Sequence, residues 1–294
     1  MVKRQINLDP KLLTNPDKIL FPKSKITKKE LADYYSSVAH LMLPFTQNRL
    51  LTMQRFPDGI TGEGFYQKNI GDYFPDWIDY APIKNADGST TNYVIANNPE
   101  TFTYLAYQAV ITFHLWLSKA DKIMYPDKIV IDLDPGKNTT FEMVKKYALI
   151  VHDTFAQRGI TTFVMTTGSK GIHVVAPIIR RYTFDQVHEY THNLARELVK
   201  QYPDSLTLEI RKDKRKGKLF VDYIRNTFGQ TSVAPYSVRP IEDAPVATPV
   251  TWDEVADKKL TAQSYTIRNV EKRLEKHHDV WKNYYTTKNS LKIT

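Results

Sequence analysis

Apolar residues recur at helix and strand spacing along the first part of the chain, and this pattern predicts its elements. Thr27 and Glu30 have the spacing of a capping box and open a helix over 27–42, because apolar residues then follow on one face. Asn98 and Pro99 begin a second helix that we expect to end near residue 109. Further strands are predicted at 49–56, 64–68, 91–96 and 110–117, and for the last of these a helix is the alternative.

From residue 128 onward, strand and helix patterns alternate. Two more helices are predicted from the capping-box pairs Thr139/Glu142 and Thr183/Gln186, and the first of them ends at Gly159. Strands are predicted at 128–134, 160–166, 172–178, 206–210 and 219–224. Strands and hairpins interleaved with helices predict an α+β fold built on mixed sheets.

Length and composition narrow the class of protein. The 294 residues suffice for one large domain or for two small ones that share a core. No run of eighteen apolar residues occurs, so we expect no membrane span. The chain has no cysteine, which excludes disulfides and thiolate metal sites and fits a reducing cytoplasm. The net charge of +9 favours a polyanionic partner such as nucleic acid.

Two aspartates lie at the end of the strand predicted at 128–134. Period-two alternation places Asp132 and Asp134 on the same face, with Cα atoms ~6–7 Å apart. Two carboxylates at this distance resist joint ionisation unless a divalent cation lies between them, and hard oxygen ligands favour Mg²⁺ or Mn²⁺. The alternative is a strand end with two solvated aspartates, and a D-x-D pattern alone favours that alternative.

A third aspartate strengthens the metal hypothesis. Asp222 interrupts the otherwise apolar strand predicted at 219–224, and a buried carboxylate needs a partner. The glycine-containing segment 166–173 between two strands offers hydroxyls, backbone N–H groups, Lys170 and His173 to phosphate oxygens. It is not a P-loop, because no helix follows it. The basic run 211–218 is interpreted as a solvated turn beside phosphate.

The order of these three motifs resembles the archaeo-eukaryotic primase superfamily, and more specifically the polymerase domain of bacterial DNA ligase D. The resemblance extends from about residue 10 to about residue 270. It implies two mixed sheets flanked by helices around a central cleft, with an RRM-like C-terminal part. It also implies one primase-polymerase domain over 1–294, with a DNA-binding subdomain at 1–120 and a catalytic subdomain at 121–294. Matching segments are 18–22, 64–68, 129–136, 168–173 and 233–239.

The resemblance also implies roles for particular residues. Asp132, Asp134 and Asp222 would be catalytic and bind two divalent ions, Mn²⁺ or Mg²⁺, for phosphoryl transfer. His114 matches a family histidine near the sugar, although a histidine on a half-buried strand is the alternative. The positions implied to bind the nucleoside triphosphate are His114, Ser169, Lys170, Gly171, His173, Lys218, Gln230 and Arg239.

A second set of positions is implied to contact DNA. Lys18 and Lys28 match two lysines of a pocket for a 5′-phosphate, while Gln54 stands where the family has a third lysine. Phe65 and Tyr66 match aromatics that pack on template bases, and core packing is the alternative for them. Arg55 and Lys68 complete the DNA-binding set.

The function expected from this resemblance is template-directed nucleotide addition to 3′ ends at DNA gaps and double-strand breaks, with a preference for ribonucleotides. The expected partners are gapped or broken DNA, nucleoside triphosphates, Ku and a DNA ligase, and the expected location is the nucleoid in a prokaryotic cytoplasm. Two alternatives stay open, namely a metal-dependent nuclease and a non-catalytic DNA end-binding module. A nuclease has no evident use for the triphosphate segment, and clustered acids repel DNA unless metals are bound.

Overall fold

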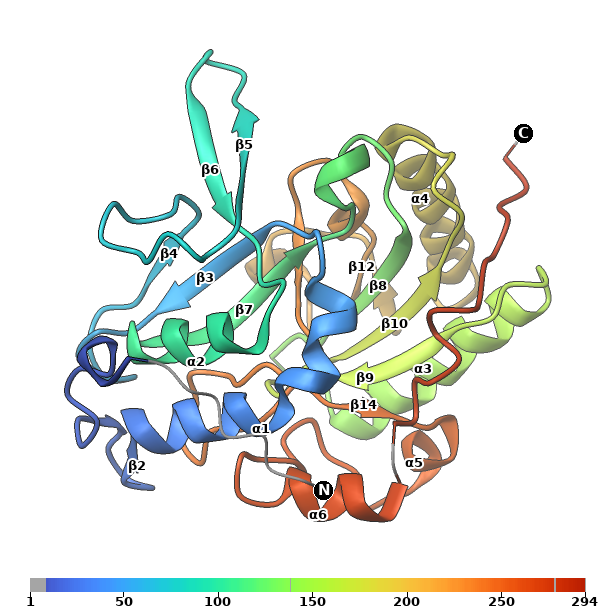
Figure 1. Ribbon diagram of the computed structural model, residues 1–294. Coiled ribbons are helices and arrows are strands. Elements are labelled where there is room, and N and C mark those ends of the chain that lie inside the picture. Colours follow the sequence, from blue (N-terminus) through green and yellow to red (C-terminus); the bar gives the residue numbers. More distant parts are fainter. Residues whose placement is uncertain (1–8, 138, 278, 294) are drawn as a thin grey trace.

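Two large sheets organise the computed structural model, which describes residues 9–137, 139–277 and 279–293 (Figure 1). The larger sheet has six strands in the order β11-β12-β8-β10-β9-β14. Only β11 and β12 pair in parallel within it, and its other neighbours are antiparallel. Its strands are β8 (Lys128–Asp134), β9 (Phe163–Thr166), β10 (Ile172–Pro177), β11 (Leu206–Thr207), β12 (Leu219–Asp222) and β14 (Pro249–Val250).

The second sheet has four antiparallel strands in the order β13-β7-β3-β4. These are β3 (Leu51–Arg55), β4 (Phe65–Gln67), β7 (Val110–Trp116) and β13 (Thr231–Val233). Because β13 follows β12, the late part of the chain returns to the sheet built by its early part. Two small antiparallel pairs complete the strands, β1 (Ile19–Phe21) with β2 (Ile26–Thr27), and β5 (Tyr80–Lys84) with β6 (Thr90–Val94). The β5–β6 hairpin projects from the body of the protein (Figure 1).

Each large sheet has its own helices and its own core. Helices α1 (Lys28–Thr46) and α2 (Pro99–Tyr107) pack with the four-stranded sheet. Helices α3 (Phe141–Ala156) and α4 (Phe184–Gln201) pack on the six-stranded sheet (Figure 1). The remaining helices are α5 (Trp252–Ala256) and α6 (Val270–His277), with short 3-10 turns η1 (Pro10–Leu12), η2 (Ala120–Lys122), η3 (Lys212–Lys214) and η4 (Ile224–Asn226).

Strand alternation decides which side chains face the space between the sheets. In β8, Ile129, Ile131 and Leu133 lie in the core under α3 and α4, whereas Val130 belongs to the core of the other sheet. Asp132 and Asp134 have the parity of Val130, so both aspartates lie on the face turned toward the four-stranded sheet. Among the described residues, none of the helices combines the length and apolar character that a bilayer crossing requires.

Most of the predicted elements form, with corrections at their ends. Residues 110–116 form a strand rather than a helix, and Thr27 caps α1 with Glu30 as predicted. The cap of α3 is Thr140 and not Thr139, because the Thr139 hydroxyl donates to the Gly217 carbonyl. The strands predicted at 160–166, 206–210 and 219–224 are shorter than expected. The elements that were not predicted are β1, β2, β5, β13, β14, α5 and α6.

Candidate active site

Three neighbouring strands bring the central candidate residues together. Asp132 of β8 lies directly opposite Asp222 of β12 on one side and opposite His173 of β10 on the other. Both carboxylates are buried, each with 8% of its surface exposed. Positions 132, 173 and 222 are far apart in the sequence, so sheet register alone makes them one cluster.

One arginine contacts both buried carboxylates. Arg225 Nε lies 3.1 Å from Asp222 Oδ2 and 3.4 Å from Asp132 Oδ2. These are ion-pair contacts with poor angles, since Nε has no hydrogen-bond partner among the described residues. His173 Nε2 lies 3.5 Å from the same Asp132 oxygen. The acids therefore face Arg225 and His173, two groups supplied by the chain itself.

These contacts divide the acids into two electrostatic types. Burial, followed by the negative charge of Asp132, raises the pKa of Asp222 to about 6. Burial would also raise the pKa of Asp132, but His173 and Arg225 outweigh it and hold that pKa at about 2. Asp132 is thus the stabilised anion of the pair, and Asp222 is the carboxylate whose charge is poorly accommodated.

Asp134 has a separate partner. Arg215 Nη1 donates to Asp134 Oδ2 at 2.8 Å, and the Arg215 side chain is buried. Lys212 Nζ is 3.9 Å from the same oxygen. The prediction that 211–218 is a solvated turn is therefore wrong at Arg215, because this guanidinium satisfies a carboxylate and packs on the Phe220 ring.

The donor set fits a hard divalent cation, although its carboxylates already contact an arginine. Asp132 and Asp222 offer oxygen ligands on neighbouring strands, and both already contact the Arg225 guanidinium. Within the described part of the chain, no three His, Asp or Glu side chains already stand in a metal-binding arrangement. The carboxylate oxygens that would hold a cation contact Arg225 in this structure.

The predicted triphosphate segment is a tight turn against β8. A Cβ at Gly171 would lie 2.4 Å from the Leu133 carbonyl oxygen, so this glycine permits close approach of two backbones. The backbone N–H groups of Ser169 and Gly171 both donate to Thr167 Oγ1. They are therefore engaged within the turn, which leaves the Ser169 hydroxyl and the exposed Lys170 for phosphate.

A cavity of about 800 Å³ opens beside this turn. Asp134 and the residues just after it form one wall, Ser169 and Lys170 form another, and residues 212–213 and 261–263 close it. Lys137, Lys170 and Lys212 give the cavity positive charge. A polyanion adjacent to Asp134 would be well matched to this lining.

Unpaired buried polar atoms lie on two strands of the four-stranded sheet and at Arg239, which follows β13. Among the described residues, Thr52 Oγ1, Gln54 Oε1, His114 Nε2 and Arg239 Nε are buried without a hydrogen-bond partner. Burial, followed by the charges of Arg239 and Arg225, lowers the pKa of His114 to about 3, so the imidazole is neutral. Unpaired buried polar atoms are costly, and a ligand with hydroxyl or amide groups would satisfy them.

Two predicted triphosphate ligands do not join the cluster. The Lys218 ammonium donates to the Pro203 carbonyl at 2.6 Å, which ties it to the turn after α4. Gln230 lies exposed in the turn before β13, where its N–H bonds to Thr227. Their contact with a nucleotide stays a prediction.

The predicted phosphate-pocket lysines are neighbours. Lys28 is 94% buried and donates from Nζ to the Thr14 carbonyl, and its backbone N–H bonds to the Lys18 carbonyl. Burial, followed by the charges of Lys18 and Arg55, lowers the pKa of Lys28. Lys18 also pairs with the exposed Asp58 at 2.9 Å. Lys18 and Arg55 therefore lie near enough to Lys28 for their charges to oppose its protonation.

Gln54 and Arg55 point to opposite faces of β3. Gln54 pairs in register with Tyr66 and lies on the face of His114, whose ring is 5.7 Å from that of Tyr66. Arg55 pairs with Phe65 on the other face, and its guanidinium lies 5.5 Å from the Phe65 ring. Phe65 and Tyr66 are 45% and 60% exposed, so neither is core, and Lys68 is exposed beyond the end of β4.

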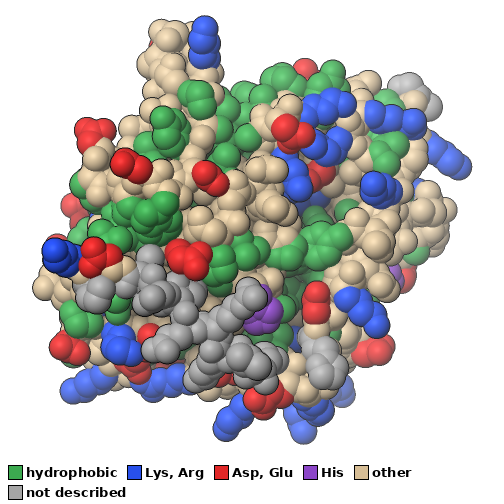
Figure 2. Space-filling model, viewed as in Figure 1, with side chains coloured by type: hydrophobic (Ala, Val, Ile, Leu, Met, Phe, Trp, Pro, Cys, Tyr) green, Lys and Arg blue, Asp and Glu red, His purple; other side chains and the backbone are tan. Residues whose placement is uncertain are grey.

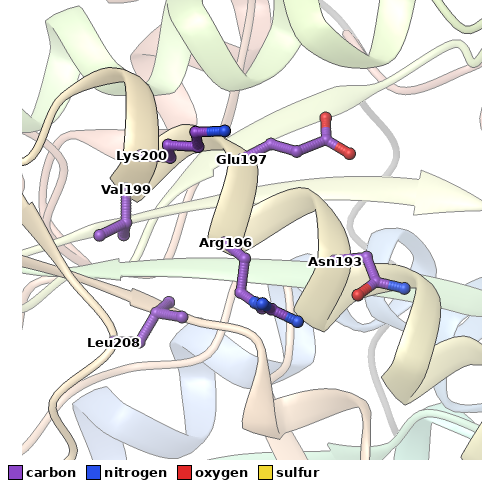
Figure 3. A pocket seen from close by; sticks show the side chains of 6 residues that line it. All are labelled: Asn193, Arg196, Glu197, Val199, Lys200 and Leu208. Atoms are coloured by element: carbon purple, nitrogen blue, oxygen red, sulfur yellow. The ribbon is translucent and has the colours of Figure 1, made fainter.

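Other surface features lie apart from this cluster. A hollow of about 580 Å³ along α4 is lined by Asn193, Arg196, Glu197, Val199, Lys200 and Leu208, and it contains no candidate site residue (Figure 3). On the face shown in Figure 2, lysine and arginine side chains are spread over several places with acidic side chains among them. The net positive charge does not form one stripe on that face.

Sequence reasoning missed three residues of the site. Arg225 follows Asp222 by three positions, and Arg215 was hidden in a basic run. Thr167 was grouped with phosphate ligands, but its hydroxyl holds the turn together. Only the i, i+3 spacing of Asp222 and Arg225 was a usable signal.

The chain is similar to known proteins along most of its length. The family model for the LigD primase-polymerase domain matches residues 27–281. The chain is 34% identical over 250 residues to the multifunctional non-homologous end joining protein LigD of Mycolicibacterium smegmatis, covering 84% of this chain and 33% of that protein. It is 33% identical over 278 residues to the bifunctional non-homologous end joining protein LigD of Bacillus subtilis, covering 94% and 44%.

The fold has a solved counterpart. The polymerase domain of Mycobacterium tuberculosis Ligase D in complex with DNA superposes with a TM-score of 0.87 at 29% identity, covering 94% of this chain and 98% of that one. The chain spans about a third of the length of the mycobacterial relative and under half of the Bacillus one. The family match over most of the chain is decisive, and the protein belongs to the LigD primase-polymerase domain family.

Proposed function

We propose that this protein is a template-directed nucleotidyltransferase that extends 3′ ends at gaps and breaks in DNA. The observation that carries the proposal is the pairing of Asp132 with Asp222 across β8 and β12, beside His173 and the turn at 167–171. Membership of the LigD primase-polymerase family and the likeness to a polymerase domain solved with DNA support it.

The three acidic residues are proposed to bind metal ions. Asp132, Asp134 and Asp222 would hold two divalent ions, Mn²⁺ or Mg²⁺. Such ions neutralise a triphosphate and favour ionisation of an attacking 3′-hydroxyl. Asp222, the acid whose charge is least compensated, gains most from a bound cation.

The nucleotide would lie between the two sheets. Its phosphates would face Ser169, Lys170 and the lysine-lined cavity beside Asp134. Its sugar and base would meet the unpaired polar atoms of His114, Gln54 and Arg239. A buried polar site of this kind discriminates against an analogue that lacks a hydroxyl, which supports the expected preference for ribonucleotides.

DNA would approach from the side of β4 and the start of α1. The exposed Tyr66 and Phe65 offer stacking faces for bases, worth ~1–3 kcal/mol each. Lys18, Lys28 and Arg55 would bind the 5′-phosphate on the far side of a gap, helped by the N-terminus of α1. We place this activity at the nucleoid of a prokaryotic cytoplasm, in cooperation with Ku and a DNA ligase.

Primer extension on labelled, gapped DNA tests the proposal. With Mn²⁺ and nucleoside triphosphates, the wild-type protein should lengthen the primer by templated additions, and Asp222→Asn should abolish extension. DNA binding, measured by fluorescence anisotropy, should survive in this variant because the phosphate-binding lysines lie elsewhere.

Two other outcomes of this assay would indicate a different function. Shortening of the labelled strand with Mn²⁺ and no nucleotides would identify a nuclease. Tight binding of gapped DNA without any change in strand length would identify a non-catalytic end-binding module. Full extension by Asp222→Asn would refute the assignment of the acidic cluster.

A further inference from the structure

Two histidines lie one turn apart on α4. His188 and His192 are both half-buried, and their rings are nearly parallel, with planes 25° apart and centroids 6.2 Å apart. Side chains four positions apart on a helix are neighbours on one face, so both imidazoles can reach a common point. Neither residue belongs to the proposed polymerase site.

The turn after β12 supports both rings. The Tyr223 ring stacks on His192, with centroids 4.5 Å and planes 18° apart, and its centroid is 5.2 Å from that of His188. Tyr223 packs with the core under α3 and α4, whereas Asp132 and Asp222 lie side by side on the face toward the four-stranded sheet. The histidine pair therefore lies on the opposite face of the six-stranded sheet from the acidic cluster.

A hydroxyl of the same turn orients His188. Thr227 Oγ1 lies 3.2 Å from His188 Nδ1. When Nδ1 donates in this bond, the lone pair of the ring is on Nε2, which is then available as a ligand. Metal-binding histidines commonly donate their other ring N–H in this way, because the bond fixes the tautomer and the direction of the ring.

His188 also has the charge state that metal binding needs. Burial, followed by the charge of His192, lowers the pKa of His188, and Asp185 opposes this shift only in part. The imidazole is therefore neutral near pH 7.5. A neutral imidazole is a good ligand for Zn²⁺, Ni²⁺ and Cu²⁺, whereas Mg²⁺ and Mn²⁺ prefer oxygen ligands.

We propose that His188 and His192 form a binding site for a divalent transition metal ion that prefers nitrogen ligands, namely Zn²⁺, Ni²⁺ or Cu²⁺. This site goes beyond the proposed polymerase activity and does not depend on it. Within the described part of the chain, no three His, Asp or Glu side chains form a ready-made cluster, so the ion has two protein ligands here. Water or a further ligand completes its coordination.

A bound ion fastens α4 to the segment that follows Asp222. It holds both imidazoles in place, and with them the stacking on Tyr223 and the contact with Thr227. Because the unfolded chain lacks this arrangement of the two rings, the ion favours the folded state. Zn²⁺ should therefore raise the melting temperature of the wild type by more than that of His188→Gln.

Calorimetric titration of Ni²⁺ into protein without a histidine tag, near pH 7.5 and with excess Mg²⁺ to occupy the acidic cluster, tests the site. The wild type should bind one Ni²⁺ per chain. His188→Gln and His192→Gln should each weaken binding roughly a hundredfold, and Thr227→Val roughly tenfold. His40→Gln is the matched control and should bind Ni²⁺ like the wild type, because His40 is an exposed histidine on α1 with no second histidine in that helix.

The EPR spectrum of bound Cu²⁺ gives a readout that does not depend on activity or stability. It should show hyperfine splitting from two imidazole nitrogens in the wild type and from one in His192→Gln. Equal Ni²⁺ affinity of the wild type, His188→Gln and His192→Gln would overturn the proposal, and so would a wild type that binds no Ni²⁺. Neither result bears on the polymerase assignment, which primer extension tests separately.

Discussion

Asp132 and Asp222 are the same residue type on neighbouring strands, yet removing their charges is expected to change the stability of the metal-free protein in opposite directions. The perturbation is Asp222→Asn in one variant and Asp132→Asn in another, each with nearly unchanged side-chain volume. Burial and the charge of Asp132 raise the pKa of Asp222 from 3.8 to about 6. The neighbouring His173 and Arg225 overcome burial and hold the pKa of Asp132 at about 2.

The sign of each effect follows from proton linkage. Folded Asp222 keeps its proton to higher pH than the unfolded chain does, so stability falls as pH rises from about 4 to about 6. Above that pH range the charge of Asp222 lowers the free energy of unfolding by roughly 3 kcal/mol, taking about 1.4 kcal/mol for each pKa unit. Asp132 loses its proton at a lower pH in the folded protein than in the unfolded chain. Its charge therefore adds roughly 2 kcal/mol to the free energy of unfolding above about pH 4, and this stabilisation is lost as the pH falls through about 2.

Urea unfolding in EDTA, followed by tryptophan fluorescence, measures both effects. Near pH 7.5, Asp222→Asn should raise the free energy of unfolding by about 1–3 kcal/mol, and Asp132→Asn should lower it by a similar amount. The gain from Asp222→Asn should shrink near pH 4, where wild-type Asp222 already carries its proton. Changes of the same sign in the two variants would refute this account of the electrostatics.

Three further predictions concern the turn at 167–171, the phosphate pocket and the sugar. Gly171→Ala places a Cβ 2.4 Å from the Leu133 carbonyl oxygen, so it should destabilise the protein by about 1–3 kcal/mol, as measured by urea unfolding. It should also raise the KM for nucleotide in steady-state extension kinetics. The wild type should prefer gapped DNA with a 5′-phosphate roughly tenfold, and Lys18→Ala combined with Lys28→Ala should erase this preference. The control Lys29→Ala removes an exposed lysine that pairs with Asp33, and it should keep the preference. Equal anisotropy Kd values of the wild type for DNA with and without the 5′-phosphate would contradict the pocket. The kcat/KM for a ribonucleotide should exceed that for the matching deoxyribonucleotide, and equal values would end the claim of sugar selection.

The linear sequence determined the elements and the chemical character of the site. Capping boxes at Thr27 and Thr183 and the alternation along β8 and β10 are local patterns, because they depend on hydrogen bonds and side-chain directions within a few residues. The same alternation was enough to place Asp132 and Asp134 on one face of a strand. Family-like motifs then indicated a polymerase, which the family match supports.

Tertiary structure alone decided how these residues are partnered. Short strands such as β13 and β14 form because partner strands accept their backbone hydrogen bonds, and no local pattern encodes that. The difference between Asp132 and Asp222 and the ion pairs of Arg215 and Arg225 arise from groups that sheet register and turns bring within 4 Å. Electrostatic energy depends on distance and burial in space, so residue type and spacing along the chain could not predict which acid is stabilised and which is not.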